Sequence, residues 1–253
     1  MTGTPDPSDA ISVLAGYPVT APPLPRPAVL DQFWGDLTFV HWPVHPDSVT
    51  HLYPPGIRPD VFADGRTYVA LVPFVMSRSR LGAVLPIPYF GTFPETNIRL
   101  YSTDDAGRHG LLFRSLETAR LAVVPLTRAG LGIPYAWAKL RTARIDDQVT
   151  YHSVRRWPRR GLRSRLTIRV GDVIEPTSLE IWLTARWGVH TRNAGRTWWL
   201  PVAHEPWQLR AAEIVELDDN LLDASGVRPA GEHLRALFSQ GMPARVGRPA
   251  VVR

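Results

Sequence analysis

Prolines and glycines interrupt this chain throughout its length. The sequence has 25 prolines and 19 glycines among its 253 residues. Proline lacks a backbone donor and ends helices, and glycine favours turns, so this density leaves little room for long helices. Short alternating segments between such residues are typical of strands. The spacing therefore predicts a mainly β (α+β) domain with a few short helices.

Individual segments support that prediction. Strands are predicted at residues 33–40, 67–72, 93–101, 110–116, 165–170, 196–203 and 209–217, with a hairpin at 140–155. Short helices are predicted at residues 47–52, 117–127 and 178–184, the last capped by Thr177 or Ser178. No repeat or change in composition divides the chain. We expect a proline-rich flexible arm at residues 1–29, one domain at 30–240 and a C-terminal tail at 241–253.

Composition excludes several classes of protein. Hydrophobic residues make up 44% and charged residues 21% of the chain, as in ordinary soluble domains. The absence of cysteine excludes disulfides, thiolate catalysis, iron–sulfur clusters and cysteine-ligated zinc. No apolar run reaches membrane-spanning length, and the start lacks the pattern of a signal peptide. We therefore expect a cytoplasmic protein without membrane association.

The segment from Phe93 to Tyr101 places polar groups two residues apart. Side chains with this spacing on a strand point to the same face. One face therefore carries Glu95, Asn97, Arg99 and Tyr101, and the opposite face is mostly apolar. Such a polar face is either the wall of a cavity or the solvated side of a sheet with a weak Glu–Arg ion pair. In a cavity, Glu95 could act as an acid, a base or a charge anchor.

Lys139 is the only lysine of the chain, and it follows a sharply turned segment. Gly130, Gly132 and Pro134 set the turn, and aromatic residues follow. A lysine that emerges from an apolar stretch can have a lowered pKa and act as a nucleophile. The alternative is a lysine at the start of a strand with its ammonium in water.

Histidines 41 and 45 have the spacing of a metal site on a helix. Pro43 and Pro46 prevent the helix that would bring both rings to one face, so we expect no metal and no other cofactor. His41 is predicted to sit beside Trp42 as a partly buried histidine with satisfied hydrogen bonds.

Two further groups have both structural and functional interpretations. Glu180 lies between apolar neighbours, so it could be a buried or cavity-facing acid, or it could cap a helix. The tryptophans of the second half are predicted to form core and cavity lining; they are Trp182, Trp187, Trp198, Trp199 and Trp207.

The run from Arg155 to Arg165 is densely basic and contains Trp157. It could contact a polyanion, but no nucleic-acid-reading motif accompanies the charge. Pro158 and Gly161 favour a solvated loop between two strands. We expect a small-molecule ligand as partner, no nucleic acid, and a possible homo-oligomer.

Taken together, the motifs resemble the YqjF-like family of proteins of unknown function. The residues that carry the resemblance are His41–Val44, Tyr53–Gly56, Val72–Phe74, Phe93–Tyr101, Gly132–Tyr135 and Ser178–Glu180. The likeness runs from about Asp31 to Phe238. This family is similar to the acetoacetate decarboxylase-like superfamily, which implies a closed, cone-like β-barrel with the active site inside.

The resemblance also implies a candidate site and a departure from the superfamily. Acetoacetate decarboxylases use a lysine pair in a Gly-x-Pro-Lys-Lys loop and a glutamate on a preceding strand, for which Glu95 is the counterpart. Here Tyr135 and Ala136 replace both lysines, so an imine cannot form there. Lys139 lies beyond these positions, and we expect it not to form an imine.

The leading hypothesis is an acid–base enzyme of the lyase or isomerase type that acts on a small keto acid or polyketide-like compound. The candidate catalytic residues are Glu95 as base, Tyr135 as oxyanion donor and Arg99 as orienting cation. Residues expected to contact the substrate are Asn97, Tyr101, His41, Lys139 and Glu180. The alternatives are a non-catalytic ligand-binding protein of the same fold and an imine-forming decarboxylase or aldolase that uses Lys139.

Overall fold

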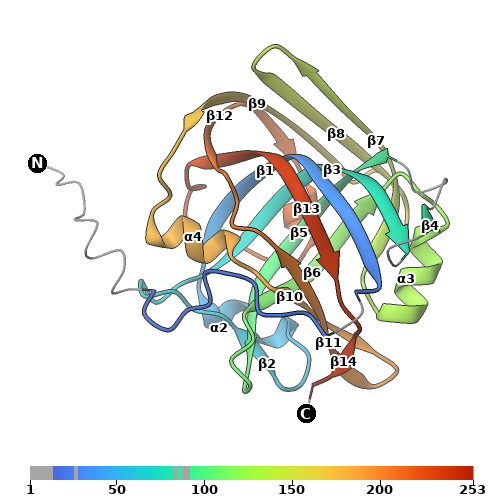
Figure 1. The fold of residues 1–253 in the computed structure, drawn as a ribbon. Coiled ribbons are helices and arrows are strands. Elements are labelled where there is room, and N and C mark those ends of the chain that lie inside the picture. The colour runs from blue at the N-terminus through green and yellow to red at the C-terminus, as the bar shows by residue number, and fades with distance from the viewer. Residues whose placement is uncertain (1–13, 26–27, 82–84, 87–91, 253) are drawn as a thin grey trace, which may run out of the picture.

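Strands dominate the structure, a computed structural model that describes residues 14–25, 28–81, 85–86 and 92–252 (Figure 1). The strands are β1 (Leu30–Val44), β2 (Ile57–Pro59), β3 (Thr67–Leu81), β4 (Leu85–Pro86), β5 (Thr92–Asp104), β6 (Gly110–Thr118), β7 (Tyr135–Ile145), β8 (Gln148–Trp157), β9 (Arg163–Val173), β10 (Gly188–Asn193), β11 (Arg196–His204), β12 (Arg210–Asp219), β13 (Ala236–Val246) and β14 (Ala250–Val251). The helices are α2 (Pro46–Val49), η1 (Thr50–Leu52), α3 (Val123–Leu131), α4 (Ser178–Thr184) and α5 (Leu221–Ala224). The predicted mainly β fold with a few short helices is confirmed. Within the described ranges, no helix is long and apolar enough to cross a membrane.

The strands form one mixed sheet that closes on itself. Neighbouring strands follow the order β14-β11-β10-β6-β7-β8-β9-β12-β13-β1-β3-β5-β2, and β4 pairs with β3. Two further pairings, β5 with β6 and β11 with β13, join strands that are distant in this order. Closure satisfies the backbone groups that an open edge would leave unpaired. The closed barrel implied by the family resemblance is therefore present.

Five strands, β13, β1, β3, β5 and β6, form a wall that is shared by two rings. On one side of this wall, β13 pairs with β12 through residues 236–238 and with β11 through residues 244–246. On the other side, β6 pairs with β10 at Leu111 and with β7 at residues 116–118. One ring passes through β7, β8, β9 and β12, and the other passes through β10 and β11. In Figure 1, β7–β9 lie toward the top of the view and β10 and β11 toward the bottom.

Side chains of the shared wall point alternately into two compartments. Ile98 and Leu100 of β5 face the packed compartment, where apolar side chains of β8 and β9 fill the space; these are Val149, Tyr151, Leu166 and Ile168. Phe39, Val72 and Phe74 face the cavity compartment, which encloses a cavity of about 540 Å³. Both faces of the wall are buried, and each large apolar side chain removed from water stabilises the fold by roughly 1.5–3 kcal/mol.

The helix predicted at residues 117–127 begins later than expected. β6 continues to Thr118, and α3 covers Val123–Leu131. Thr118 pairs with Glu95 of β5, so ladder pairing holds this segment in a strand despite the helix propensity of Glu117. By contrast, α4 spans the predicted residues, and its cap is Thr177.

The sheet extends past the predicted domain boundary at residue 240. β13 runs to Val246 and β14 follows, so most of the predicted tail belongs to the sheet. At the other end, residues 14–25 of the predicted arm contact the barrel. The Tyr17 hydroxyl donates to the Ala185 carbonyl at 2.7 Å, and Trp187 Nε1 donates to the Pro18 carbonyl at 2.5 Å. Residues 1–13 and 26–27 of the predicted arm lie outside the described residues.

Candidate functional site

Three polar side chains of β5 line the cavity. Glu95, Asn97 and Arg99 alternate along the strand with residues of the packed compartment, and all three are buried. Asn97 Oδ1 accepts no hydrogen bond from any described residue. The polar face predicted from the two-residue spacing is therefore a cavity wall and not a solvated surface.

Glu95 is a buried acid without a charged partner. Its side chain is 2% exposed, and Oε1 has no hydrogen-bond partner among the described residues. Burial raises the pKa of Glu95 to about 8, although the hydroxyls of Tyr135 and Thr118 favour the ionised carboxylate. Glu95 is consequently protonated at neutral pH and becomes half-ionised just above it.

Tyr135 is brought beside Glu95 by the turn that precedes β7. α3 ends at Gly132, whose φ of 69° is left-handed and whose missing side chain leaves room for the backbone of Arg192. Arg128 Nη1 donates to the Tyr135 carbonyl at 2.9 Å, and Tyr135 pairs with Leu116 of β6. Burial and the neighbouring Glu95 raise the pKa of Tyr135 well above its usual value, so its phenol remains a proton donor.

Arg99 is a buried cation that no described acid neutralises. Its guanidinium lies 5.3 Å from the centre of the Phe39 ring, and its Nε has no hydrogen-bond partner in the described part of the chain. Burial lowers the pKa of Arg99, but a guanidinium remains protonated in proteins. Burying an uncompensated charge is costly, so this position favours an anionic ligand.

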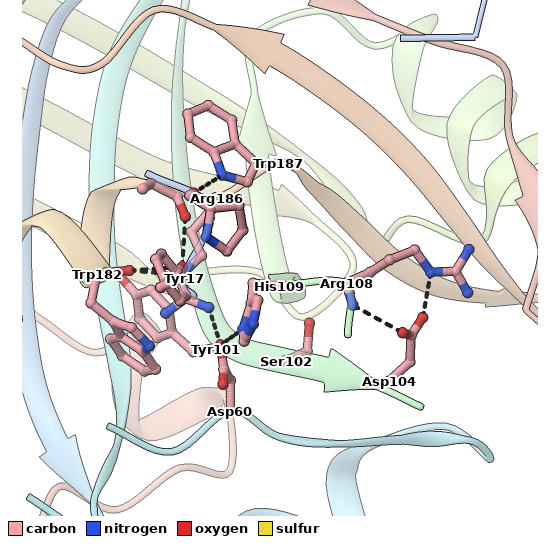
Figure 2. Close-up of polar contacts among 12 residues, drawn as sticks. Tyr17, Asp60, Tyr101, Ser102, Asp104, Arg108, His109, Trp182, Arg186 and Trp187 are labelled. Carbon is pink, nitrogen blue, oxygen red and sulfur yellow. Dashed lines mark hydrogen bonds and ion pairs between the residues drawn. The ribbon is translucent and has the colours of Figure 1, made fainter. Parts of the chain in front are cut away.

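Arg186 is a second guanidinium on the cavity wall, and no motif in the sequence indicated it. Figure 2 shows its polar contacts. Arg186 follows α4, forms an ion pair with Asp60, and lies 3.9 Å from the centre of the Trp182 ring. His109 Nδ1 is 2.8 Å from the same carboxylate. Burial alone would raise the pKa of Asp60, but Arg186 and His109 together lower it. Arg186 Nη2 has no hydrogen-bond partner among the described residues.

His204, at the end of β11, also lines the cavity. Its Nδ1 lies 2.6 Å from the Glu205 carbonyl, which can only accept a hydrogen bond, so Nδ1 carries the proton. Burial lowers the pKa of His204, which leaves a neutral ring with an unprotonated Nε2. The His204 ring packs at 5.0 Å from that of Trp207, which lines the cavity as predicted. The sequence contained no local signal for His204, since no motif surrounds it.

Four of the predicted substrate-contacting residues do not line the cavity. Tyr101 is fully buried and stacks on Trp182 at 5.4 Å. His41 is fully buried, and both ring nitrogens lack a partner within the described chain, so the predicted satisfied, partly buried histidine is wrong. Lys139 is exposed on β7.

Glu180, the fourth of these residues, has a structural role. It completes the capping box of α4 with Thr177, and it forms an ion pair with Arg235 at 2.6 Å. A capping role was one of the two interpretations of its position in the sequence.

A Ser–His–Asp chain lies outside the cavity. Ser102 Oγ is 2.9 Å from His190 Nδ1, and His190 Nε2 is 3.1 Å from Asp104, which also accepts from Arg108. Ser102, Asp104 and Arg108 are drawn in Figure 2. Ser102 and His190 are both fully buried, and burial lowers the pKa of His190 to about 4. A substrate cannot reach such a serine, so this network stabilises the packing of β5 against β10.

Comparison with known proteins places the chain in a family. A model of the family DUF2071, an uncharacterized conserved protein, matches residues 31–243. The chain belongs to this family. It is 28% identical over 201 residues to the uncharacterized protein YqjF of Bacillus subtilis (strain 168), which covers 79% of this chain and 82% of the relative.

Solved structures with the same fold are acetoacetate decarboxylase-like enzymes. The acetoacetate decarboxylase from Legionella pneumophila superposes with a TM-score of 0.63 at 14% identity, covering 99% of this chain and 98% of that one. An acetoacetate decarboxylase-like enzyme from Sphingomonas wittichii RW1 has a TM-score of 0.62 at 15% identity, with coverage of 90% and 94%. The enduracididine biosynthesis enzyme MppR complexed with pyruvate has a TM-score of 0.62 at 16% identity, with coverage of 89% and 91%. At these identities the likeness establishes the fold.

Proposed function

We propose that the protein is an acid–base enzyme of the lyase or isomerase type that acts on a keto acid without forming an imine. The observation that carries this proposal is Glu95, a buried carboxyl with a pKa of about 8 that faces a cavity. Titratable groups with strongly shifted pKa values inside a cavity are characteristic of catalytic acids and bases. The structurally similar MppR was solved with pyruvate, a keto acid, which supports this substrate class.

Arg99 and Arg186 provide the anchor for the substrate carboxylate. Both guanidiniums line the cavity, and each has an N–H group without a partner among the described residues. Asp60 neutralises Arg186, whereas Arg99 has no acidic partner in the described chain, so the site carries an excess positive charge. Guanidinium groups bind carboxylates through paired, charge-assisted hydrogen bonds.

Glu95 and Tyr135 supply the proton-transfer chemistry. In its ionised form Glu95 removes a proton from the carbon next to the ketone; the electron pair of that C–H bond forms a C=C bond, and the π pair of the C=O bond moves to the ketone oxygen. Tyr135 donates a hydrogen bond to the resulting enolate oxygen, with the Asn97 amide as a second possible donor. Return of a proton from Glu95 to the same carbon gives exchange with solvent, and its delivery to the enolate oxygen completes an isomerisation to the enol. A pKa near the working pH allows the same carboxyl to remove and return the proton.

Hydrogen exchange tests the proposal directly. The protein should catalyse exchange of the methyl protons of pyruvate with deuterium from solvent, followed by proton NMR. Glu95→Gln should reduce the rate at least 100-fold, because general acid–base catalysis contributes about 10²–10⁴. Glu213→Gln, on the exposed side of β12, is the matched control and should keep the wild-type rate. Equal exchange by wild-type protein and Glu95→Gln would refute the role of Glu95.

A ligand-binding protein without catalysis is the second candidate. Most of the cavity lining is apolar, and no lysine occupies the position of the lysine pair in the decarboxylases. Tight binding of keto acids with no exchange would favour this candidate.

Imine chemistry through Lys139 would require its amine to face the cavity. The Lys139 side chain is exposed and does not line the cavity. Borohydride treatment with a keto acid should therefore give no covalent adduct by intact mass. An adduct that disappears in Lys139→Arg would restore the imine mechanism.

A further inference from the structure

The part of the cavity that is lined by α3 and the segments next to it is mostly apolar, and the proposed chemistry does not use it; we call this part the arm. The side chains that line this arm are Val123, Leu126, Thr127, Leu131, Ile133 and Leu116. Leu126 is 69% exposed although it also lines the cavity, so the arm reaches the surface at α3.

The strand register orders the parts of the cavity. Arg99 lies opposite Phe113 of β6, and Glu95 lies opposite Thr118, the last residue of that strand. α3 begins five residues later, at Val123. At about 3.3 Å per residue, the Cα atoms of Arg99 and Glu95 are roughly 13 Å apart. Glu95 therefore stands between a cationic end at Arg99 and an apolar end beneath α3.

The cavity is much larger than a small keto acid. One heavy atom occupies on the order of a water molecule's share of liquid, roughly 30 Å³. The volume of about 540 Å³ then has room for about ten to eighteen heavy atoms after allowance for imperfect filling. Pyruvate, with its six heavy atoms, would leave the arm beneath α3 empty.

α3 is fixed in place over this arm. Thr191 Oγ1 donates to the Leu131 carbonyl at 2.9 Å, and Asn193 Nδ2 donates to the carbonyls of Ala129 and Gly130 at 2.9 Å. These contacts attach the carboxyl end of the helix to β10. The apolar arm is thus a preformed part of the fold, which suits a ligand that is ordered on binding.

We propose that the substrate is an amphipathic oxo acid. Its carboxylate binds Arg99 and Arg186, its ketone lies beside Glu95, and a hydrocarbon tail of about five or more carbons lies in the arm lined by α3. The assignment of the ketone rests on the function proposed above, whereas the site for the tail rests on the lining and volume of the cavity alone.

Binding of a series of 2-oxo acids tests the proposal. Calorimetric titration with pyruvate, 2-oxohexanoate and 2-oxodecanoate should show a dissociation constant that falls by up to about fourfold per added methylene, as expected for burial of apolar surface. Octan-1-ol, which lacks the carboxylate, should bind more weakly than 2-oxooctanoate. A dissociation constant that does not change with chain length would overturn the proposal.

Variants in α3 locate the tail. Thr127→Phe narrows the arm and should remove most of the gain in affinity from chain length, measured as the ratio of the dissociation constants of pyruvate and 2-oxodecanoate. Ala129→Phe, an exposed position of the same helix that does not line the cavity, is the matched control and should behave as wild type. If Thr127→Phe lowers the melting temperature, Leu126→Glu at the exposed opening provides the same test. Unchanged length dependence in a folded Leu126→Glu or Thr127→Phe protein would show that the tail lies elsewhere.

The outcomes separate this proposal from the proposed function. Dependence of affinity on chain length without proton exchange would support the tail site and refute the enzyme. Proton exchange that requires Glu95, with no preference for long acids, would support the enzyme and refute the tail site.

Discussion

Glu95 and Glu117 are buried glutamates of the same wall that face opposite compartments. Glu117 lies opposite Thr96 across the β5–β6 ladder, so it points to the packed side, away from the cavity. There Arg155 of β8 donates to both of its carboxylate oxygens. Glu95 points into the cavity, where no basic side chain of the described residues forms an ion pair with it.

The difference between the two glutamates distinguishes a structural acid from a candidate catalytic one. Burial raises the pKa of Glu117, and the hydrogen bonds and charge of Arg155 hold that rise back. At Glu95 only hydroxyl groups oppose burial, and the pKa reaches about 8. In the packed compartment Arg155 neutralises the buried carboxylate of Glu117. The cavity compartment leaves an acid and two guanidiniums with unused hydrogen-bonding capacity.

The largest expected effect is that of Glu95 on how the stability of the protein depends on pH. The folded state retains the proton of Glu95 to about pH 8, whereas an unfolded glutamate loses it near its ordinary value of 4.5. The contribution of protonated Glu95 to the free energy of unfolding is therefore fully present below about pH 4.5. It falls by about 5 kcal/mol as the pH rises to about 8. Glu95→Gln should remove this part of the pH dependence in denaturant unfolding curves. Parallel curves for the two proteins would show that Glu95 titrates normally.

The same substitution at the other glutamate should destabilise the protein at any pH at which the Glu117–Arg155 ion pair forms. Glu117→Gln leaves Arg155 buried without its charge partner, which costs about 3–5 kcal/mol. Glu95→Gln at about pH 5, where Glu95 is already neutral, should change stability by less than about 1 kcal/mol. Urea unfolding compares Glu95→Gln with wild type at about pH 5, and Glu117→Gln with wild type across a pH series that extends above neutrality. A Glu117→Gln protein as stable as Glu95→Gln would contradict the distinction between the compartments.

A pair of leucines offers a smaller test of the same contrast. Leu71 of β3 is buried in the packed compartment, and Leu37 of β1 is buried on the cavity wall. Leu71→Ala should cost about 3–5 kcal/mol, because surrounding atoms contact the side chain on all sides. Leu37→Ala should cost about 2 kcal/mol, since one side of that leucine already faces empty space. Equal losses in thermal unfolding would indicate that the cavity is filled in solution.

The sequence predicted those features of the site that depend on local spacing. Two-residue alternation placed Glu95, Asn97 and Arg99 on one face, and the glycines before Tyr135 indicated the turn that presents it. The resemblance to YqjF-like proteins added the closed barrel. Prediction was weaker where long-range pairing competes with propensity, as at Glu117, which the β5–β6 ladder holds in a strand.

The sequence by itself determined which side chains of β5 share a face, because strand geometry depends only on neighbours in the chain. It could not determine which face would enclose a cavity, since both faces of the wall are buried by strands from distant parts of the sequence. Tertiary structure also brought Arg186 to the wall that carries Arg99, and it placed Lys139 in solvent. The environment that raises the pKa of Glu95 exists only after the ring closes, because burial depends on contacts between residues far apart in the chain.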